Sequence, residues 1–131
     1  RIGADALLSG MDPSAFDALL LPGGPAVAAL RKEEGMVSLV RCFGEAGKVV
    51  AGICAAPLLM HDAGLLEGRR HTAHFTTQEE LLAAEGEERV IVDGSLVTSR
   101  GAGTAAEFGL ALAALLEGKE AVQEVAEAIM V

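Results

Sequence analysis

The sequence is poor in aromatic residues and in positive charge. It has no tryptophan and no tyrosine, and only four phenylalanines. Ten lysines and arginines stand against nineteen aspartates and glutamates, so the formal net charge is −9. Nucleic-acid binding needs basic side chains for the phosphates and, for single strands, aromatic rings on which bases stack. We therefore expect no nucleic-acid partner.

Cysteines, histidines and long apolar segments are also scarce. The two cysteines, Cys42 and Cys54, form no CxxC motif, and the three histidines lie at no zinc-binding spacing from them. The sequence therefore indicates no metal and no cofactor. Apolar runs such as "ALLLP" and "LALAALL" are far shorter than the roughly 20 residues of a membrane span, and no secretory leader is visible. We expect a cytoplasmic protein with free thiols and no membrane partner.

Glycine and small apolar residues dominate what is present. Sixteen glycines and a hydrophobic content of 51% favour a close-packed α/β protein with glycine-built turns. The length of 131 residues fits one domain, residues 1–131. Continuous apolar runs, typical of buried parallel strands, alternate with amphipathic segments, which predicts a doubly wound sheet. We expect strands at 2–8, 16–21, 48–53 and 69–75, a hairpin at 89–99, and helices at 25–34, 36–46, 55–66, 76–86, 103–118 and 119–130.

Cys54 stands where a buried strand is expected to become a helix, in the sequence "AGICAAP". At the start of a helix, unpaired N–H groups and the positive end of the dipole favour the thiolate form. The small neighbours suit a sharp turn that displays the side chain, as in a nucleophile elbow. The alternative is inert packing, because free cysteine is often buried. The residues alone leave both interpretations open, whereas Cys42, inside an expected helix, is the weaker candidate.

Three glycine-rich turns, "LPGGP", "AGICAAP" and "SRGAGT", each follow an expected strand. The carboxyl ends of parallel strands meet at one edge of a sheet, so these turns should form one crevice. There the Gly23-Gly24 pair and the amide of Ala55 are candidates to stabilise an oxyanion, although the pair alone is equally consistent with a plain turn. The sequence "GAGT" lacks the third glycine of a dinucleotide-binding fingerprint, so a capped helix explains it better.

Of the three histidines, His74 is the preferred partner for Cys54. His61 lies seven residues after Cys54, about 10 Å along a helix, which is too far for a direct contact. His71 and His74 flank the strand expected at 69–75, and His74 is nearer to the end that faces the crevice. We therefore take Cys54 and His74 as candidate catalytic residues.

Three segments resemble the DJ-1/ThiJ/PfpI superfamily, and its DJ-1 branch more than its PfpI branch. They are "DALLLPGGPAVAAL", "VVAGICAAPLLMHDAGLLEGRRHT" and "VDGSLVTSRGAGTAAEFGLALAALLEG". The resemblance implies a flavodoxin-like sandwich of the class I glutamine amidotransferase type, a nucleophile elbow at Cys54, and a homodimer. It further implies that Cys54 is readily oxidised, with the amides of Gly24 and Ala55 beside it. Arg100 would lie near the site or the dimer interface.

The sequence departs from the family pattern at several places. Ala55 stands where the PfpI branch has histidine, which counts against peptidase chemistry, and Ala102 replaces the proline of "TSRGPGT". The histidine that some eukaryotic members carry before "RVIVDG" has no counterpart. The family normally begins with a strand and a "GFEEIE"-type helix whose glutamate tunes the cysteine, whereas this chain starts after that point. We expect the sequence to be incomplete at its N-terminus.

The resemblance implies a cofactor-independent enzyme on small reactive carbonyls or glycated substrates: a glyoxalase or a protein or nucleotide deglycase, of the hydro-lyase or hydrolase class. In this hypothesis the Cys54 thiolate attacks the aldehyde of methylglyoxal. The absent glutamate, or His74, moves the proton that isomerisation to lactate requires. The rival hypothesis is a redox-sensing stress-response chaperone in which Cys54 is oxidised rather than catalytic. A third outcome is an inactive member of the family.

Overall fold

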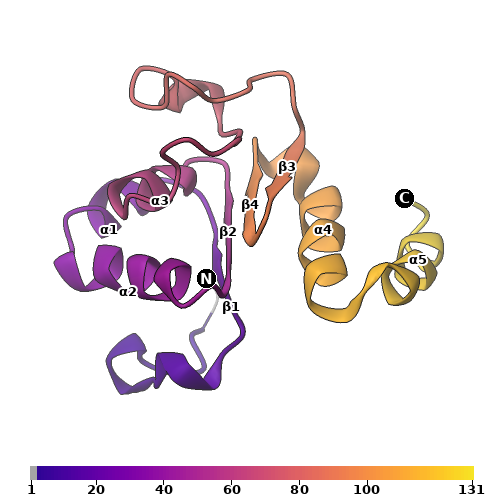
Figure 1. The fold of residues 1–131 in the computed structure, drawn as a ribbon, viewed down its shortest axis with the longest axis horizontal. Coiled ribbons are helices and arrows are strands. Elements are labelled where there is room, and N and C mark those ends of the chain that lie inside the picture. The colour runs from indigo at the N-terminus through magenta and orange to yellow at the C-terminus, as the bar shows by residue number, and fades with distance from the viewer. Residues whose placement is uncertain (1–2) are drawn as a thin grey trace.

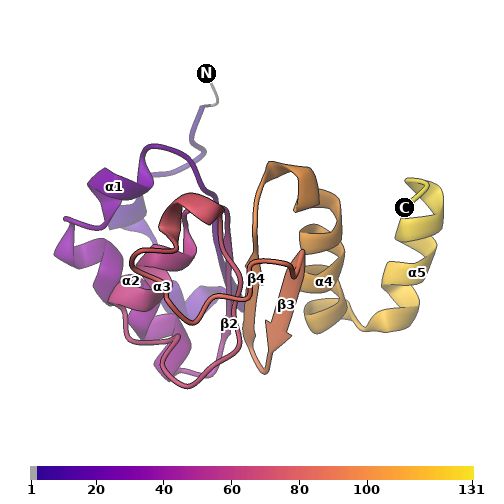
Figure 2. The ribbon, with the colours of Figure 1, turned by 90° about the horizontal axis from the view of Figure 1, so that it is seen from above.

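The fold is a four-stranded sheet with helices on both faces (Figures 1 and 2). The computed structural model describes residues 3–131. The strands are β1 (Ala18–Leu21), β2 (Val49–Ile53), β3 (Val90–Asp93) and β4 (Leu96–Ser99). The α-helices are α1 (Val27–Leu30), α2 (Glu34–Glu45), α3 (Pro57–Asp62), α4 (Ala105–Glu117) and α5 (Lys119–Ala128). Four single turns of 3-10 helix are η1 (Leu8–Gly10), η2 (Pro13–Ala15), η3 (Phe75–Thr77) and η4 (Ala102–Thr104).

The strand order is β1-β2-β4-β3, and the first three of these strands run parallel. Only β3 is antiparallel, and it joins β4 through the predicted Asp93-Gly94 turn, where Gly94 has φ +61°. In the register of the sheet, Leu21 lies beside Gly52 and Ile53 beside Ser99. The three glycine-rich turns therefore leave the sheet at the same edge. The doubly wound, mostly parallel sheet and the hairpin are confirmed.

The sheet separates two apolar clusters. Figure 2 shows α1, α2 and α3 on one face and α4 on the other, with α5 packed outside α4. Successive side chains of β2 point to opposite faces of the sheet. Val50 packs in the apolar cluster that contains Leu59 and Met60 of α3, whereas Ala51 packs in the cluster that contains Val97 of β4 and Phe108 of α4. Both Val50 and Ala51 are fully buried. The central position of β2 explains its continuous apolar run.

Gly52 allows α3 to sit directly on the end of β2. A Cβ at this position would lie 2.8 Å from Met60 Sδ and 3.3 Å from the backbone nitrogen of Pro57. A larger side chain would have to displace the side chain of Met60 and would press on the backbone of Pro57. The glycine therefore fixes how close α3 approaches, and with it the path of residues 54–56, which connect β2 to α3.

The segment that links α3 to β3 differs from the prediction. We expected a strand at 69–75 and a helix at 76–86, but residues 70–74 have no strand partner and only η3 forms after them. The backbone N–H of Thr72 donates to Thr98 Oγ1, and Thr72 Oγ1 donates to the carbonyl of Glu88, so these side-chain bonds and isolated backbone bonds hold the segment in place of a strand ladder. In the expected helix Leu81 is buried but Leu82 is 87% exposed. Only Leu81 and the partly buried Ala84 pack against the core from this segment, and this apolar stripe is too narrow to hold a helix there.

The start of the chain also differs from the prediction. A strand was expected at 2–8, yet residues 3–8 contain none, and residue 2 lies outside the described part. Consequently β1 is an edge strand, and Leu20 on it is half exposed. That the sequence is incomplete at its N-terminus stays a prediction, as does the homodimer. Within residues 3–131, none of the helices combines the length and apolar character required to cross a membrane.

Candidate active site

Cys54 occupies a strained turn immediately after β2. Its φ is +66°, and Met130 is the only other non-glycine residue with positive φ among residues 3–131. A left-handed backbone costs a residue with a side chain about 1–2 kcal/mol, and such strain is concentrated at functional sites. The sequence predicts Cys54 at the start of the helix that follows this strand. In the structure α3 begins three residues later, at Pro57, and is only six residues long. Cys54 therefore does not stand at the N-terminus of a long helix. The turn at Cys54 determines where its side chain lies.

Two backbone hydrogen bonds hold this turn between its neighbours. The N–H of Cys54 donates to the carbonyl of Ser99 at 2.8 Å, and the N–H of His74 donates to the carbonyl of Cys54 at 2.9 Å. The ends of β2 and β4 and the segment before η3 therefore meet at Cys54. The thiol-bearing residue is half buried, whereas Cys42 is exposed on α2. Neither cysteine forms a disulfide.

The "LPGG" turn lies directly against Cys54. A Cβ added to Gly23 would be 2.6 Å from Cys54 Cβ, 2.8 Å from the carbonyl oxygen of Ile53 and 3.3 Å from the backbone nitrogen of Ala55. Only glycine fits at this distance. Gly24 adopts φ +108°, a conformation that side chains disfavour. The structure thus brings Gly23, Cys54 and Ala55 into contact, as the three-turn crevice predicted.

His74 is next to Cys54 through its backbone, while its ring has other partners. Nδ1 of the imidazole lies 2.9 Å from Thr76 Oγ1, and the ring centroid is 4.3 Å from that of Phe75. The ring also borders Gly101, whose Cβ position would be 3.7 Å from His74 Cδ2. The other histidines do not reach the site in the same way. His61 is exposed in the last turn of α3, and His71 is buried with Nδ1 at 2.9 Å from the carbonyl of Arg69.

A buried hydroxyl pair, missed by the sequence analysis, supports the turn after β4. Ser99 and Thr104 are both almost fully buried, and their hydroxyl oxygens lie 2.5 Å apart. The carbonyl of Arg89 lies 3.0 Å from Ser99 Oγ and that of Gly101 lies 2.8 Å from Thr104 Oγ1, so one hydroxyl donates to the other and the second donates to its carbonyl. The side chain of Thr104 does not cap α4, because it bonds to this turn instead. The signal was present in "TSRGAGT", where a serine and a threonine flank the glycines.

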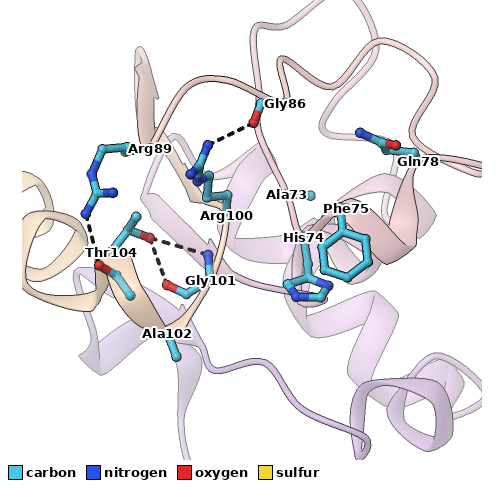
Figure 3. Close-up of a pocket in the computed structure, with 11 residues that line it drawn as sticks. Ala73, His74, Phe75, Gln78, Gly86, Arg89, Arg100, Gly101, Ala102 and Thr104 are labelled. Carbon is cyan, nitrogen blue, oxygen red and sulfur yellow. Dashed lines mark hydrogen bonds between the residues drawn. The ribbon is translucent and has the colours of Figure 1, made fainter.

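A pocket of about 470 Å³ lies beside the elbow, between the turn after β4 and the segment around η3 (Figure 3). Arg100 and His74 line it, whereas Cys54 does not. Arg89, at its rim, forms a two-pronged ion pair with Glu107 at 2.8 and 2.9 Å. The hydrogen bonds from Arg89, and more weakly the nearby charge of Arg100, lower the pKa of Glu107 below its ordinary value. Within residues 3–131, no three His, Cys, Asp or Glu side chains cluster as metal ligands would.

A mostly parallel α/β sheet with a cysteine on a positive-φ turn at the end of a central strand has the backbone arrangement found in α/β proteins with a nucleophile elbow. A sequence model of the DJ-1/PfpI family matches residues 1–115, and the chain belongs to that family. The resemblance noted from the sequence is therefore confirmed.

Three relatives identified by sequence similarity agree with this family assignment. The chain is 37% identical to Protein dj-1beta of Drosophila melanogaster, over all of this chain and 72% of the relative. It is 39% identical to Protein DJ-1 homolog A of Arabidopsis thaliana, over 99% of this chain. It is 38% identical to Deglycase TK1284 of Thermococcus kodakarensis, over 76% of this chain. The matched region spans only 34% of the Arabidopsis protein and 61% of the Thermococcus protein.

Solved structures share the fold. The structure of VC2308 protein matches with a TM-score of 0.88 and 35% identity, over 99% of this chain and 69% of that one. Drosophila melanogaster DJ-1beta matches with a TM-score of 0.80 and 36% identity, over 88% of this chain and 64% of that one. The flavodoxin-like fold of this family, predicted from the sequence, is thereby confirmed.

Proposed function

We propose that this chain carries the nucleophile of an enzyme that acts on small reactive carbonyls, with Cys54 as that nucleophile. The observation that carries the proposal is the strained φ of +66° at Cys54, directly beneath Gly23. Such strain persists only where the surrounding structure enforces it. Relatives supply the reaction class: one is named Deglycase TK1284, and a Caenorhabditis elegans relative, 30% identical, is named Glutathione-independent glyoxalase DJR-1.2.

The chemistry begins with addition of the thiolate to the aldehyde of methylglyoxal. The Cys54 Sγ–C bond forms while the carbonyl π bond breaks, which places negative charge on the former carbonyl oxygen. The amides of Gly24 and Ala55 are our proposed donors to that oxygen. A base then moves a proton from C1 to C2, and water hydrolyses the resulting thioester, so that methylglyoxal and water give lactate. His74 is the proposed base from the described residues, because its backbone bonds to Cys54 and the residue lines the pocket beside the turn at Cys54.

Partial alkylation tests the proposal without changing the sequence. We expect lactate formation from methylglyoxal to fall in proportion to the fraction of Cys54 that has reacted with iodoacetamide, as quantified by peptide mass spectrometry. Cys42, an exposed thiol on α2, is the internal control. Activity that instead follows Cys42 labelling, or survives full labelling of Cys54, would contradict the proposal.

The second candidate function is oxidation sensing, favoured by the same half-buried thiol. A relative of known structure, 29% identical, is described as Toxoplasma gondii DJ-1, oxidized. In this hypothesis mild peroxide converts Cys54 to sulfenic or sulfinic acid and leaves Cys42 a thiol. Mass spectrometry of peroxide-treated protein checks it. Selective oxidation of Cys54 in a protein that forms no lactate would favour the sensor, whereas equal oxidation of both cysteines would argue against special activation of either.

A further inference from the structure

The pocket beside Cys54 is lined by positively charged and neutral groups and by no carboxylate of the described residues. This is unusual on a chain of net charge −9. Figure 3 shows Arg100 and Gly101 to the left of the His74 ring, with Ala102 below Gly101; all four residues line the pocket. A concave site with a few convergent polar groups is the usual form of a small-molecule site.

Arg100 is the cation in this pocket that makes no direct ion pair among residues 3–131, although its charge acts weakly on the nearby Glu107. The charge of Arg89 is paired, because its Nε and Nη2 bond to the two carboxylate oxygens of Glu107, and Nη2 also bonds to the carbonyl of Gly103. Arg100 Nη1 donates only to the carbonyls of Gly86 and Glu87, at 3.1 and 3.3 Å. Within residues 3–131 it forms no ion pair, and its remaining N–H donors have no protein acceptor. Two carbonyls thus orient the guanidinium and leave its charge available.

The pocket and the elbow are parts of one arrangement. The N–H of Cys54 donates to the carbonyl of Ser99, and Arg100 is the next residue along the chain. On the other side, the N–H of His74 donates to the carbonyl of Cys54. A ligand in the pocket is therefore flanked by His74, whose backbone bonds to Cys54, and by Arg100, which directly follows the residue that accepts from Cys54.

We propose that this pocket is an anion subsite, in which Arg100 binds a carboxylate or phosphate group of the molecule whose carbonyl reacts at Cys54. A planar guanidinium matches both groups through paired N–H donors. The preferred substrates are then carbonyl compounds or adducts that carry an anionic group, rather than neutral aldehydes. This inference rests on the proposed function for its link to turnover, but the binding of the anion does not.

Binding of small anions tests the subsite directly. The probes are inorganic phosphate, N-acetylalanine, which has a carboxylate, and the primary amide of N-acetylalanine, which is neutral. Gly101 and Gly103 line the pocket, so the readout is the positions of their backbone amide signals in two-dimensional NMR. We expect at least one anion to shift these signals and the neutral amide to leave them unchanged. The anion that saturates at lower concentration identifies the group that the pocket prefers.

Substitution of Arg100 separates binding from a merely structural role. Because hydrogen bonds to charged groups contribute roughly 1.5–3 kcal/mol, Arg100→Gln should weaken anion binding at least about tenfold. Arg41→Gln is the matched control, since Arg41 also bonds only to a carbonyl, that of Ala63, and lies outside the pocket. Equal affinities for the neutral amide and the anions, no shift with either anion, or unchanged affinity in Arg100→Gln would overturn the subsite.

Turnover then connects the subsite to the substrate. Arg100→Gln should lower kcat/KM for the methylglyoxal adduct of N-acetylcysteine at least about ten times more than for the neutral adduct of N-acetylcysteamine. Equal losses for the two adducts would contradict a substrate anion in the pocket. A protein that forms no product but binds anions through Arg100 would contradict the proposed function and leave the subsite standing. An active protein without anion binding would contradict the subsite alone.

Discussion

Replacing Cys54 with alanine is expected to abolish lactate formation, with a loss of at least about 10³-fold. Removal of a covalent nucleophile leaves only the catalysis supplied by binding and by oxyanion donors. Gly23 and Ala55 would remain in place, because their contacts with residue 54 involve its Cβ and backbone rather than the sulfur. The measurement is kcat/KM for methylglyoxal. Cys42→Ala, on exposed α2, is the control and should retain activity.

The same position allows the backbone strain to be measured. Cys54→Ala keeps a side chain at φ +66°, whereas Cys54→Gly removes both the thiol and the steric cost. We expect the glycine variant to be about 1 kcal/mol more stable than the alanine variant, because the left-handed region costs a side chain about 1–2 kcal/mol. Ala113, in α4, is the control site: there glycine should be less stable than alanine by about 1 kcal/mol. Urea unfolding provides both values.

If the backbone at Cys54 were unstrained, the glycine variant would be less stable than the alanine variant. If Cys54→Gly proved less stable than Cys54→Ala, as at the helical control site, the elbow would store no strain, and the main argument for a displayed nucleophile would fail. If both variants kept the wild-type rate, Cys54 would not be the nucleophile.

Gly23→Ala is expected to damage stability and activity together. The added methyl group would lie 2.6 Å from Cys54 Cβ and 2.8 Å from the backbone oxygen of Ile53, so either the "LPGG" turn or the elbow must move. Overpacking of this kind typically costs about 1–3 kcal/mol, and a displacement of about 1 Å at a reacting group can lower the rate about 10²-fold. The measurements are urea unfolding and kcat/KM for methylglyoxal.

Gly109→Ala provides the control for that experiment. Gly109 lies in α4, and a Cβ there would meet nothing within 4 Å. The same chemical change should therefore stabilise the protein, by up to about 1 kcal/mol, because alanine favours a helix over glycine. If Gly23→Ala behaved like Gly109→Ala, with unchanged or higher stability and full activity, the close packing of the two turns would not matter for function.

The sequence predicted the elements whose signals are local or dictated by burial. The apolar run of "VVAGI" predicted β2 because a strand covered on both faces needs apolar residues on both, and Val50 and Ala51 do face opposite sides of the sheet. The Asp93-Gly94 dipeptide predicted the β3–β4 turn because glycine adopts φ +61° without strain. The order of strands and helices then placed the three turns at one edge.

The segment between α3 and β3 could not be predicted in the same way. Its backbone is held by distant partners, such as the hydroxyl of Thr98 on β4 for the N–H of Thr72. Arg31 after α1 likewise bonds Glu80, at 2.6 Å, and Asp62 of α3. Such bonds depend on which residues the fold brings together, and the local pattern around Glu80 resembled an amphipathic helix. The prediction of strand and helix there was wrong, although His74 still lies beside Cys54.

By itself, therefore, the sequence determined the fold class, the alternation of strands and helices that gathers the glycine-rich turns at one edge, and the choice of Cys54 over Cys42 as the candidate nucleophile. These follow from burial patterns and turn residues, which act over a few positions of the chain. Only the tertiary structure decided the strain at Cys54, its contact with Gly23, and the available charge of Arg100. Those properties depend on atoms far apart in sequence: the "LPGG" turn closes on the elbow, and the carbonyls of Gly86 and Glu87, rather than a carboxylate, hold the arginine.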